Sequence, residues 1–102
     1  MTETGLQNLI RLELSKLGVV FRRQSGKFLT RDGKREVTVG VPGEADLEFV
    51  GRGFVAFIEV KLPDGSVTPE QNNFLEHMKA LGHRAGVARS VRDAFDIIEG
   101  GK

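Results

Sequence analysis

The chain carries the stretch Pro42-Gly43-Glu44-Ala45-Asp46, and thirteen residues after Asp46 it carries Glu59-Val60-Lys61. Both stretches lie in short apolar segments, where charged side chains normally cost stability. Two carboxylates and an ammonium group at such positions indicate a shared site. The two stretches therefore predict a functional centre built on neighbouring strands.

A β-hairpin brings the two stretches together. Residues 44–50 and 54–61 have the pattern of two strands, and the glycine-rich loop between them has the pattern of a turn. Asp46 then lies opposite residue 58 or 59, and the choice depends on whether the loop contains a bulge. The first acidic residue of the site thus meets the end of the second strand.

Two acidic groups and one ammonium group are the components of a divalent-metal phosphodiesterase site. Because side chains alternate along a strand, Glu59 and Lys61 share one face and converge on Asp46. Mg²⁺ prefers carboxylate oxygens and keeps several waters, so Asp46 and Glu59 suffice as ligands, with the Val60 carbonyl as a further one. Lys61 would position the attacking water or stabilise the transition state. The alternative is an ordinary solvated sheet face.

These residues, in this order, resemble the PD-(D/E)XK nuclease superfamily. The match consists of Gly43-x-x-Asp46, then Glu59-x-Lys61, then Gln71 at the start of a helix. More narrowly, residues 3–98 are similar to the virus-type replication-repair nuclease (VRR-NUC) domain, which includes small stand-alone phage and bacterial proteins. One departure is Glu44-Ala45, where this family more often has a small residue and a proline. The supporting segments are residues 3–7, 65–71 and 86–91.

The resemblance implies a metal-dependent DNA endonuclease that uses Mg²⁺ or Mn²⁺ and leaves a 5′-phosphate and a 3′-hydroxyl. It implies that Gln71 contacts the phosphate or a water on the metal, although Gln71 also fits a helix capping box. A glutamate of the first helix would support the metal; Glu3 matches by register, and Glu13 is the competitor. Stand-alone members of the family imply a homodimer that cuts branched DNA such as Holliday junctions, in DNA repair.

Two other function classes remain open. A non-catalytic module that keeps the nuclease fold would bind DNA with a steep salt dependence and gain nothing from Mg²⁺. A protein-interaction module would require the acidic cluster to be ordinary surface. The intact set of Asp46, Glu59 and Lys61 favours the enzyme.

Length and composition predict a single domain spanning residues 1–102. With 39% hydrophobic residues, the chain can bury a modest core, and the lack of cysteine excludes disulfides and thiolate metal sites. No segment has the pattern of a membrane span or a signal peptide. We therefore expect the protein in the cytoplasm of a bacterium or of a phage-infected cell.

The net charge of +1 conceals an asymmetry. Residues 1–40 contain eight Lys or Arg and four acids, whereas residues 41–102 contain seven and ten. This division suits a phosphate backbone that is held by one part of the chain and cut by another, and the alternative is scattered surface charge. The expected nucleic-acid-binding residues are Arg22, Arg23, Lys27, Arg31, Lys34 and Arg35.

The remaining patterns predict an α/β fold with the order αβ(ββ)ββαβα, a mixed β-sheet flanked by helices as in the restriction-endonuclease-like core of the superfamily. A first helix ends at Gly18, and Thr68-Pro69 begins a helix that ends at Gly82. Asp32-Gly33 predicts a two-residue turn in a charged hairpin, as either a dimer arm or a DNA clamp. The apolar stripes of the two helices are Leu6, Leu9, Ile10, Leu14 and Leu17, and Phe74, Leu75, Met78 and Leu81.

Overall fold

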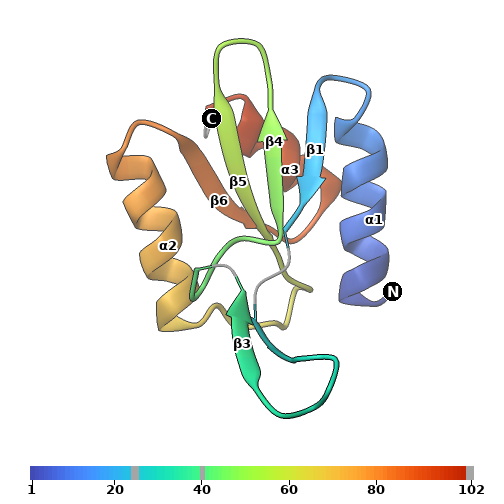
Figure 1. Ribbon diagram of the computed structural model, residues 1–102. Helices are drawn as coiled ribbons and strands as arrows, with labels where there is room; N and C mark the ends of the chain where they lie inside the picture. The colour runs from blue at the N-terminus through green and yellow to red at the C-terminus, as the bar shows by residue number, and fades with distance from the viewer. Residues whose placement is uncertain (24–25, 40, 101–102) are drawn as a thin grey trace.

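The order of helices and strands is the one expected from the sequence (Figure 1). A computed structural model describes residues 1–23, 26–39 and 41–100, and for residues 26–29 and 37–39 it describes the backbone alone. The elements are α1 (Glu3–Leu14), β1 (Val19–Arg22), β2 (Gly26–Leu29), β3 (Glu36–Val39), β4 (Leu47–Val50), β5 (Val55–Val60), α2 (Pro69–Ala80), β6 (Arg84–Ala88) and α3 (Val91–Ile98).

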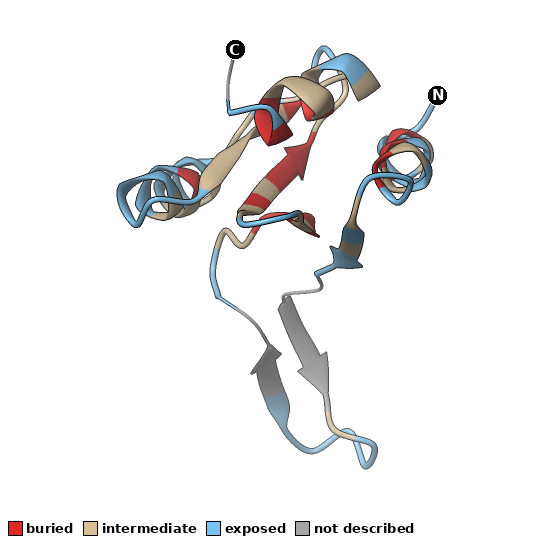
Figure 2. Cartoon of the chain, turned by 90° about the horizontal axis from the view of Figure 1, so that it is seen from above, coloured by how far each residue is buried: buried red, intermediate tan, exposed pale blue. Residues whose placement is uncertain are grey.

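The main sheet has four strands in the order β1-β4-β5-β6. Strands β1, β4 and β5 pair antiparallel, and β6 pairs parallel to β5 after a crossover through α2. Strands β2 and β3 form a separate antiparallel hairpin, which extends away from the rest of the molecule (Figure 2). The mixed sheet flanked by helices confirms the predicted α/β fold class.

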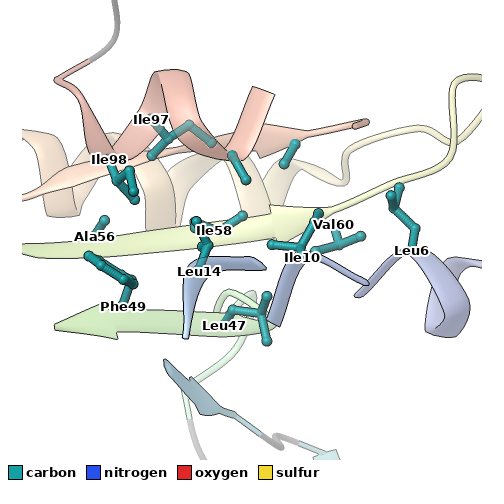
Figure 3. Close-up of a cluster of buried hydrophobic side chains, with 12 residues drawn as sticks. Leu6, Ile10, Leu14, Leu47, Phe49, Ala56, Ile58, Val60, Ile97 and Ile98 are labelled. Atoms are coloured by element: carbon teal, nitrogen blue, oxygen red, sulfur yellow. The ribbon is translucent and has the colours of Figure 1, made fainter. Parts of the chain in front are cut away.

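The core fills one face of the main sheet. Alternate residues of β4 and β5 point to this face and pack against α1 and α3 (Figure 3). Phe57 points to the opposite face, where its ring meets that of Phe74 from α2 at 5.6 Å. Glu59 has the parity of Phe57, so the sheet directs it toward α2. The cluster consists of Leu6, Ile10, Leu14, Leu47, Phe49, Ala56, Ile58, Val60, Ala88, Ala94, Ile97 and Ile98.

The apolar stripe of the first helix is narrower than predicted. Leu6, Ile10 and Leu14 are buried, but Leu9 is 38% and Leu17 60% exposed. Helix α1 ends at Leu14, so Leu17 lies in the following turn and no longer follows helical spacing. In α2 the same effect leaves the C-cap residue Leu81 exposed, while the other three predicted positions are buried or half-buried.

The predicted two-residue turn at Asp32-Gly33 is wrong, because the β2–β3 loop comprises residues 30–35. A type I′ turn needs positive φ at both central residues, and only Gly33, with φ 73°, has it. Asp32 instead accepts hydrogen bonds from the Thr30 hydroxyl and the Lys34 N–H, which lower the pKa of its carboxyl. The aspartate therefore organises a wider loop as a side-chain acceptor.

No helix in the described ranges is long and apolar enough to cross a membrane.

Candidate active site

The hairpin places Asp46 opposite Glu59, one of the two registers considered from the sequence. Leu47 pairs with Ile58, so the residue before β4 faces the penultimate residue of β5. The Oδ2 atom of Asp46 accepts a hydrogen bond of 2.9 Å from the Val60 N–H. Its main-chain carbonyl accepts a second bond, of 2.8 Å, from the Arg23 N–H. Asp46 is thus held from both neighbouring segments.

Glu59 is a carboxylate that is buried to 2% exposure. Its Oε1 accepts a hydrogen bond of 3.1 Å from Gln71 Nε2, while its Oε2 is buried without a hydrogen-bond partner. Burial raises the pKa of Glu59 to about 8, and the nearby charge of Asp46 contributes in the same direction. Burial thus disfavours the ionised form of Glu59 when no cation is bound.

Gln71 serves the helix cap and the site together. Its backbone N–H donates to the Thr68 hydroxyl at 3.1 Å, and its Oε1 accepts from the Thr68 N–H at 2.9 Å. These two bonds form the predicted capping box. The remaining amide nitrogen is the donor to Glu59. One side chain thus connects the start of α2 to the end of β5.

Lys61 and Glu3 both act electrostatically on Glu59. The Lys61 charge lowers the pKa of the Glu59 carboxyl, and the Glu3 charge raises it. The Lys61 N–H donates to the Ala88 carbonyl at 3.1 Å, which extends the β5–β6 ladder by one residue. This hydrogen bond fixes the backbone from which the Lys61 side chain projects.

Glu13, the competitor to Glu3, forms an ion pair with Lys16 at 3.2 Å on α1. This contact is the surface salt bridge expected of an exposed i,i+3 pair. Of the two helix-1 glutamates, Glu3 is the one whose charge raises the pKa of Glu59.

The donor set fits a hard divalent cation. Asp46 lies opposite Glu59 and acts on its carboxyl, and one buried carboxylate oxygen of Glu59 has no hydrogen-bond partner. Within the described ranges, no three His, Cys, Asp or Glu side chains are grouped so that they could hold a metal ion. Mg²⁺ keeps several waters and is commonly bound through one or two carboxylates. The Val60 carbonyl as a further ligand stays a prediction.

Gly43 allows the loop before Asp46 to lie against α2. It has a φ of 76°, and a Cβ at this position would lie 2.2 Å from the Glu70 carbonyl oxygen and 2.8 Å from the Gln71 nitrogen. Only glycine meets both requirements without a shift of the backbone. This contact keeps the Asp46 loop and the Gln71 turn at a fixed spacing.

The departure from the family pattern at Glu44-Ala45 leaves the entry to β4 intact. Ala45 is 1% exposed, and the Glu44 carboxylate accepts a hydrogen bond of 2.7 Å from the Arg23 Nε. Arg23 also pairs with Glu48 at 3.4 Å, and the hydrogen bond to Glu44 raises the pKa of the Arg23 guanidinium. Arg23, predicted to bind nucleic acid, thus has acidic partners within the protein.

The other predicted basic residues lie on the outside of the fold. Arg22 is exposed at the end of β1. Arg31, Lys34 and Arg35 are exposed in the loop of the protruding hairpin. The side chain of Lys27 lies outside the part of the chain that the structure describes.

Arg89 is a residue that sequence reasoning missed. Its Nη1 donates to the carbonyls of Leu62 and Gly65, each at 2.7 Å. These bonds hold the loop that joins Lys61 to α2. Arg89 lies in the supporting segment 86–91, but its contacts could not be predicted, because the parallel pairing of β5 and β6 brings it beside this loop.

The fold matches that of a solved structure described as "VRR_NUC domain". The TM-score is 0.67 and the identity is 24%, with 100% of both chains covered. No family model and no curated protein matches the sequence. The resemblance stated from the sequence is therefore confirmed at the level of the fold.

Glu59 makes the stability of the metal-free protein depend on pH. Its pKa is about 8 in the folded chain and near the ordinary value of 4.5 when unfolded. Between these values the folded state binds the extra proton, so the free energy of unfolding decreases as pH rises from about 5 to 8. One proton limits this slope to about 1.4 kcal/mol per pH unit. Urea unfolding in EDTA should show the decrease, and Glu59→Gln should flatten it; equal slopes in both proteins would contradict the assignment.

Gly43→Ala should destabilise the protein more than Gly53→Ala. Both glycines have positive φ, 76° and 81°, but a Cβ at Gly53 meets nothing within 4 Å. Gly53→Ala should therefore lower the free energy of unfolding only by the cost of a left-handed alanine, about 1–2 kcal/mol. Gly43→Ala should lower it further, because its Cβ would also collide with the backbone of α2. Urea unfolding of the two variants measures the difference, and equal losses would show that the close approach at Gly43 is absent.

Proposed function

We propose that this chain is a metal-dependent DNA endonuclease of the VRR-NUC type. The observation that carries the proposal is the buried Glu59 carboxylate, which lies opposite Asp46 and keeps one oxygen without a partner. Strongly perturbed carboxylates beside a charged partner are typical of functional sites. The shared fold with a VRR_NUC domain supports the same reading.

Asp46 and Glu59 would hold Mg²⁺ or Mn²⁺, with the Val60 carbonyl as a further ligand and Glu3 in support. Gln71 occupies Glu59 Oε1, which leaves Oε2 for the ion. When bound, the ion supplies neutralisation of phosphate charge and lowers the pKa of water. It would also hold Glu59 in the ionised form that burial disfavours.

Lys61 and Gln71 act on the substrate side in this proposal. The Lys61 ammonium would orient the attacking water and stabilise the negative charge that grows on the phosphate oxygens. The water oxygen bonds to phosphorus, and the bond to the 3′-oxygen breaks. The attacking water releases one proton to solvent and the 3′-oxygen takes one up from solvent, so the products are a 5′-phosphate and a 3′-hydroxyl. Gln71 would contact the phosphate from the start of α2, where a helix terminus also favours an anion.

The protruding β2–β3 hairpin supports DNA as the partner. Arg31, Lys34 and Arg35 are exposed together in its loop, and such a group of cations neutralises phosphates without reading sequence. We propose that the hairpin is a DNA clamp rather than a dimer arm. Recognition of DNA shape, such as a branched junction, fits a chain of this size.

A homodimer is part of the proposal. Strand β1 is an edge of the main sheet, and within the described residues no strand pairs with its outer side. Exposed apolar side chains gather around it in α1, the following turn and β1 itself. They are Leu12, Leu17, Val19 and Phe21, with exposed fractions of 48–60%. Large exposed apolar groups beside a free strand edge are typical of surfaces that pair.

Nuclease activity is tested with labelled four-way-junction, flap, nicked and linear duplex DNA. We expect cutting with Mg²⁺ or Mn²⁺, none in EDTA, and a loss of about 10²-fold or more in Lys61→Ala, because the transition-state charge is then unpaired. Lys79→Ala is the matched control, since Lys79 lies on α2 and pairs with Glu76.

The pattern of failure separates the alternatives. Folded protein that binds these DNAs with or without metal but never cuts them would be a non-catalytic DNA-binding module. Protein that neither binds nor cuts would point to a protein partner. A preference for the four-way junction would support junction resolution.

The clamp predicts a reduced salt dependence in the variant Arg31→Ala/Lys34→Ala/Arg35→Ala. Each lost phosphate contact should reduce the slope of log K against log salt by about 0.9, or about 2.7 for all three. Cleavage at saturating DNA should change little. The control removes three cations elsewhere, as Arg52→Ala/Lys79→Ala/Arg92→Ala. Equal slopes in the two triple variants would argue against the clamp.

A further inference from the structure

Two buried side-chain atoms lack a hydrogen-bond partner within the described residues, Glu59 Oε2 and Gln7 Oε1. Gln7 is 8% exposed and is not among the residues of the predicted site. A buried polar atom without a partner is rare and costs stability. Both atoms are acceptors, so neither can satisfy the other while Glu59 is ionised.

Gln7 lies on the sheet-facing side of α1, one turn after Glu3. With Ile10 and Leu14 it follows the i, i+3, i+7 spacing of a single helix face. Side chains of a helix lean toward its N-terminus, so the Gln7 amide leans toward the turn of Glu3, whose charge is felt at Glu59.

The packing places this turn at the site end of β5. Leu6 and Ile10, which flank Gln7 in α1, lie beside Val60 (Figure 3). Val60 points to the core face and the neighbouring Glu59 to the other face, so α1 meets the Glu59 end of β5 from the core side. The two orphaned acceptors thus come from elements that meet at one end of the sheet. A leucine or a methionine at this position would bury no unpaired polar atom.

We propose that Gln7 is a positioning residue for the cation, with its Oε1 accepting a hydrogen bond from the ion's hydration water while Glu59 Oε2 binds the ion directly. The inference rests on the metal site of the proposed function. Mg²⁺ and Mn²⁺ keep waters in such sites, and those waters need acceptors. A neutral amide supplies one without adding another negative charge beside Asp46, Glu59 and Glu3.

The test is binding of Mn²⁺ alone, measured by electron paramagnetic resonance and calorimetry without DNA. Gln7→Met has similar volume and no acceptor. We expect it to weaken Mn²⁺ binding about tenfold, as outer-shell changes do. In EDTA it should melt higher, by about 4–8 °C, because an unpaired buried acceptor is removed. A purely structural glutamine would give a lower melting temperature and unchanged Mn²⁺ affinity.

Gln7→Glu is the second variant, which keeps an acceptor and adds charge. It should retain Mn²⁺ binding and lose stability in EDTA, since its carboxylate would be buried. Asn8→Leu, at an exposed position of the same helix, is the control and should leave Mn²⁺ affinity unchanged.

The outcomes separate Gln7 from the proposed function. Wild-type affinity in Gln7→Met would overturn the role of Gln7 and leave the metal site standing. Absence of Mn²⁺ binding in the wild-type protein would overturn both. If Gln7→Met does not fold, loss of Mn²⁺ binding in folded Gln7→Glu overturns the inference and wild-type binding there supports it.

Discussion

Burial of the Glu59 carboxylate is the constraint on which the rest of this end of the molecule depends. A carboxylate with 2% exposure is costly to keep in a small core. The surroundings reduce that cost from several elements: Gln71 donates from α2, and the Lys61 charge acts from the end of β5. They leave one oxygen without a hydrogen-bond partner, so a positive charge at this point would be favoured.

Hydrogen bonds to backbone groups hold the rest of the proposed site in place around Glu59. Asp46 is tied to β5 through the Val60 N–H and to the segment after β1 through the Arg23 N–H. Arg89 closes the loop between Lys61 and α2 by donating to two carbonyls. The side chains of the proposed site therefore project from backbone that is fixed by the main sheet and its nearest loops, as a preorganised site requires.

Local patterns were sufficient to predict the order of the elements, the capping box of α2 and the meeting of Asp46 with the end of β5. The predicted length of the turn at Asp32 was wrong, because the Asp32 side chain accepts a hydrogen bond from the Lys34 N–H and organises a longer loop. The contacts of Arg89 and the burial of Gln7 could not be predicted, since they arise when segments distant in sequence pack together. A single sequence carries no local signal for such contacts.

The three hydrogen bonds of Gln71 restrict which amino acid can occupy that position. Its side chain must accept from the Thr68 N–H and donate to Glu59 at the same time. Glutamate lacks the donor, lysine lacks the acceptor, and asparagine is one methylene shorter. Glutamine alone among the straight-chain residues meets both needs. Natural variants of this protein should therefore almost always keep glutamine at position 71, even where the amino acids at neighbouring exposed positions of α2 vary.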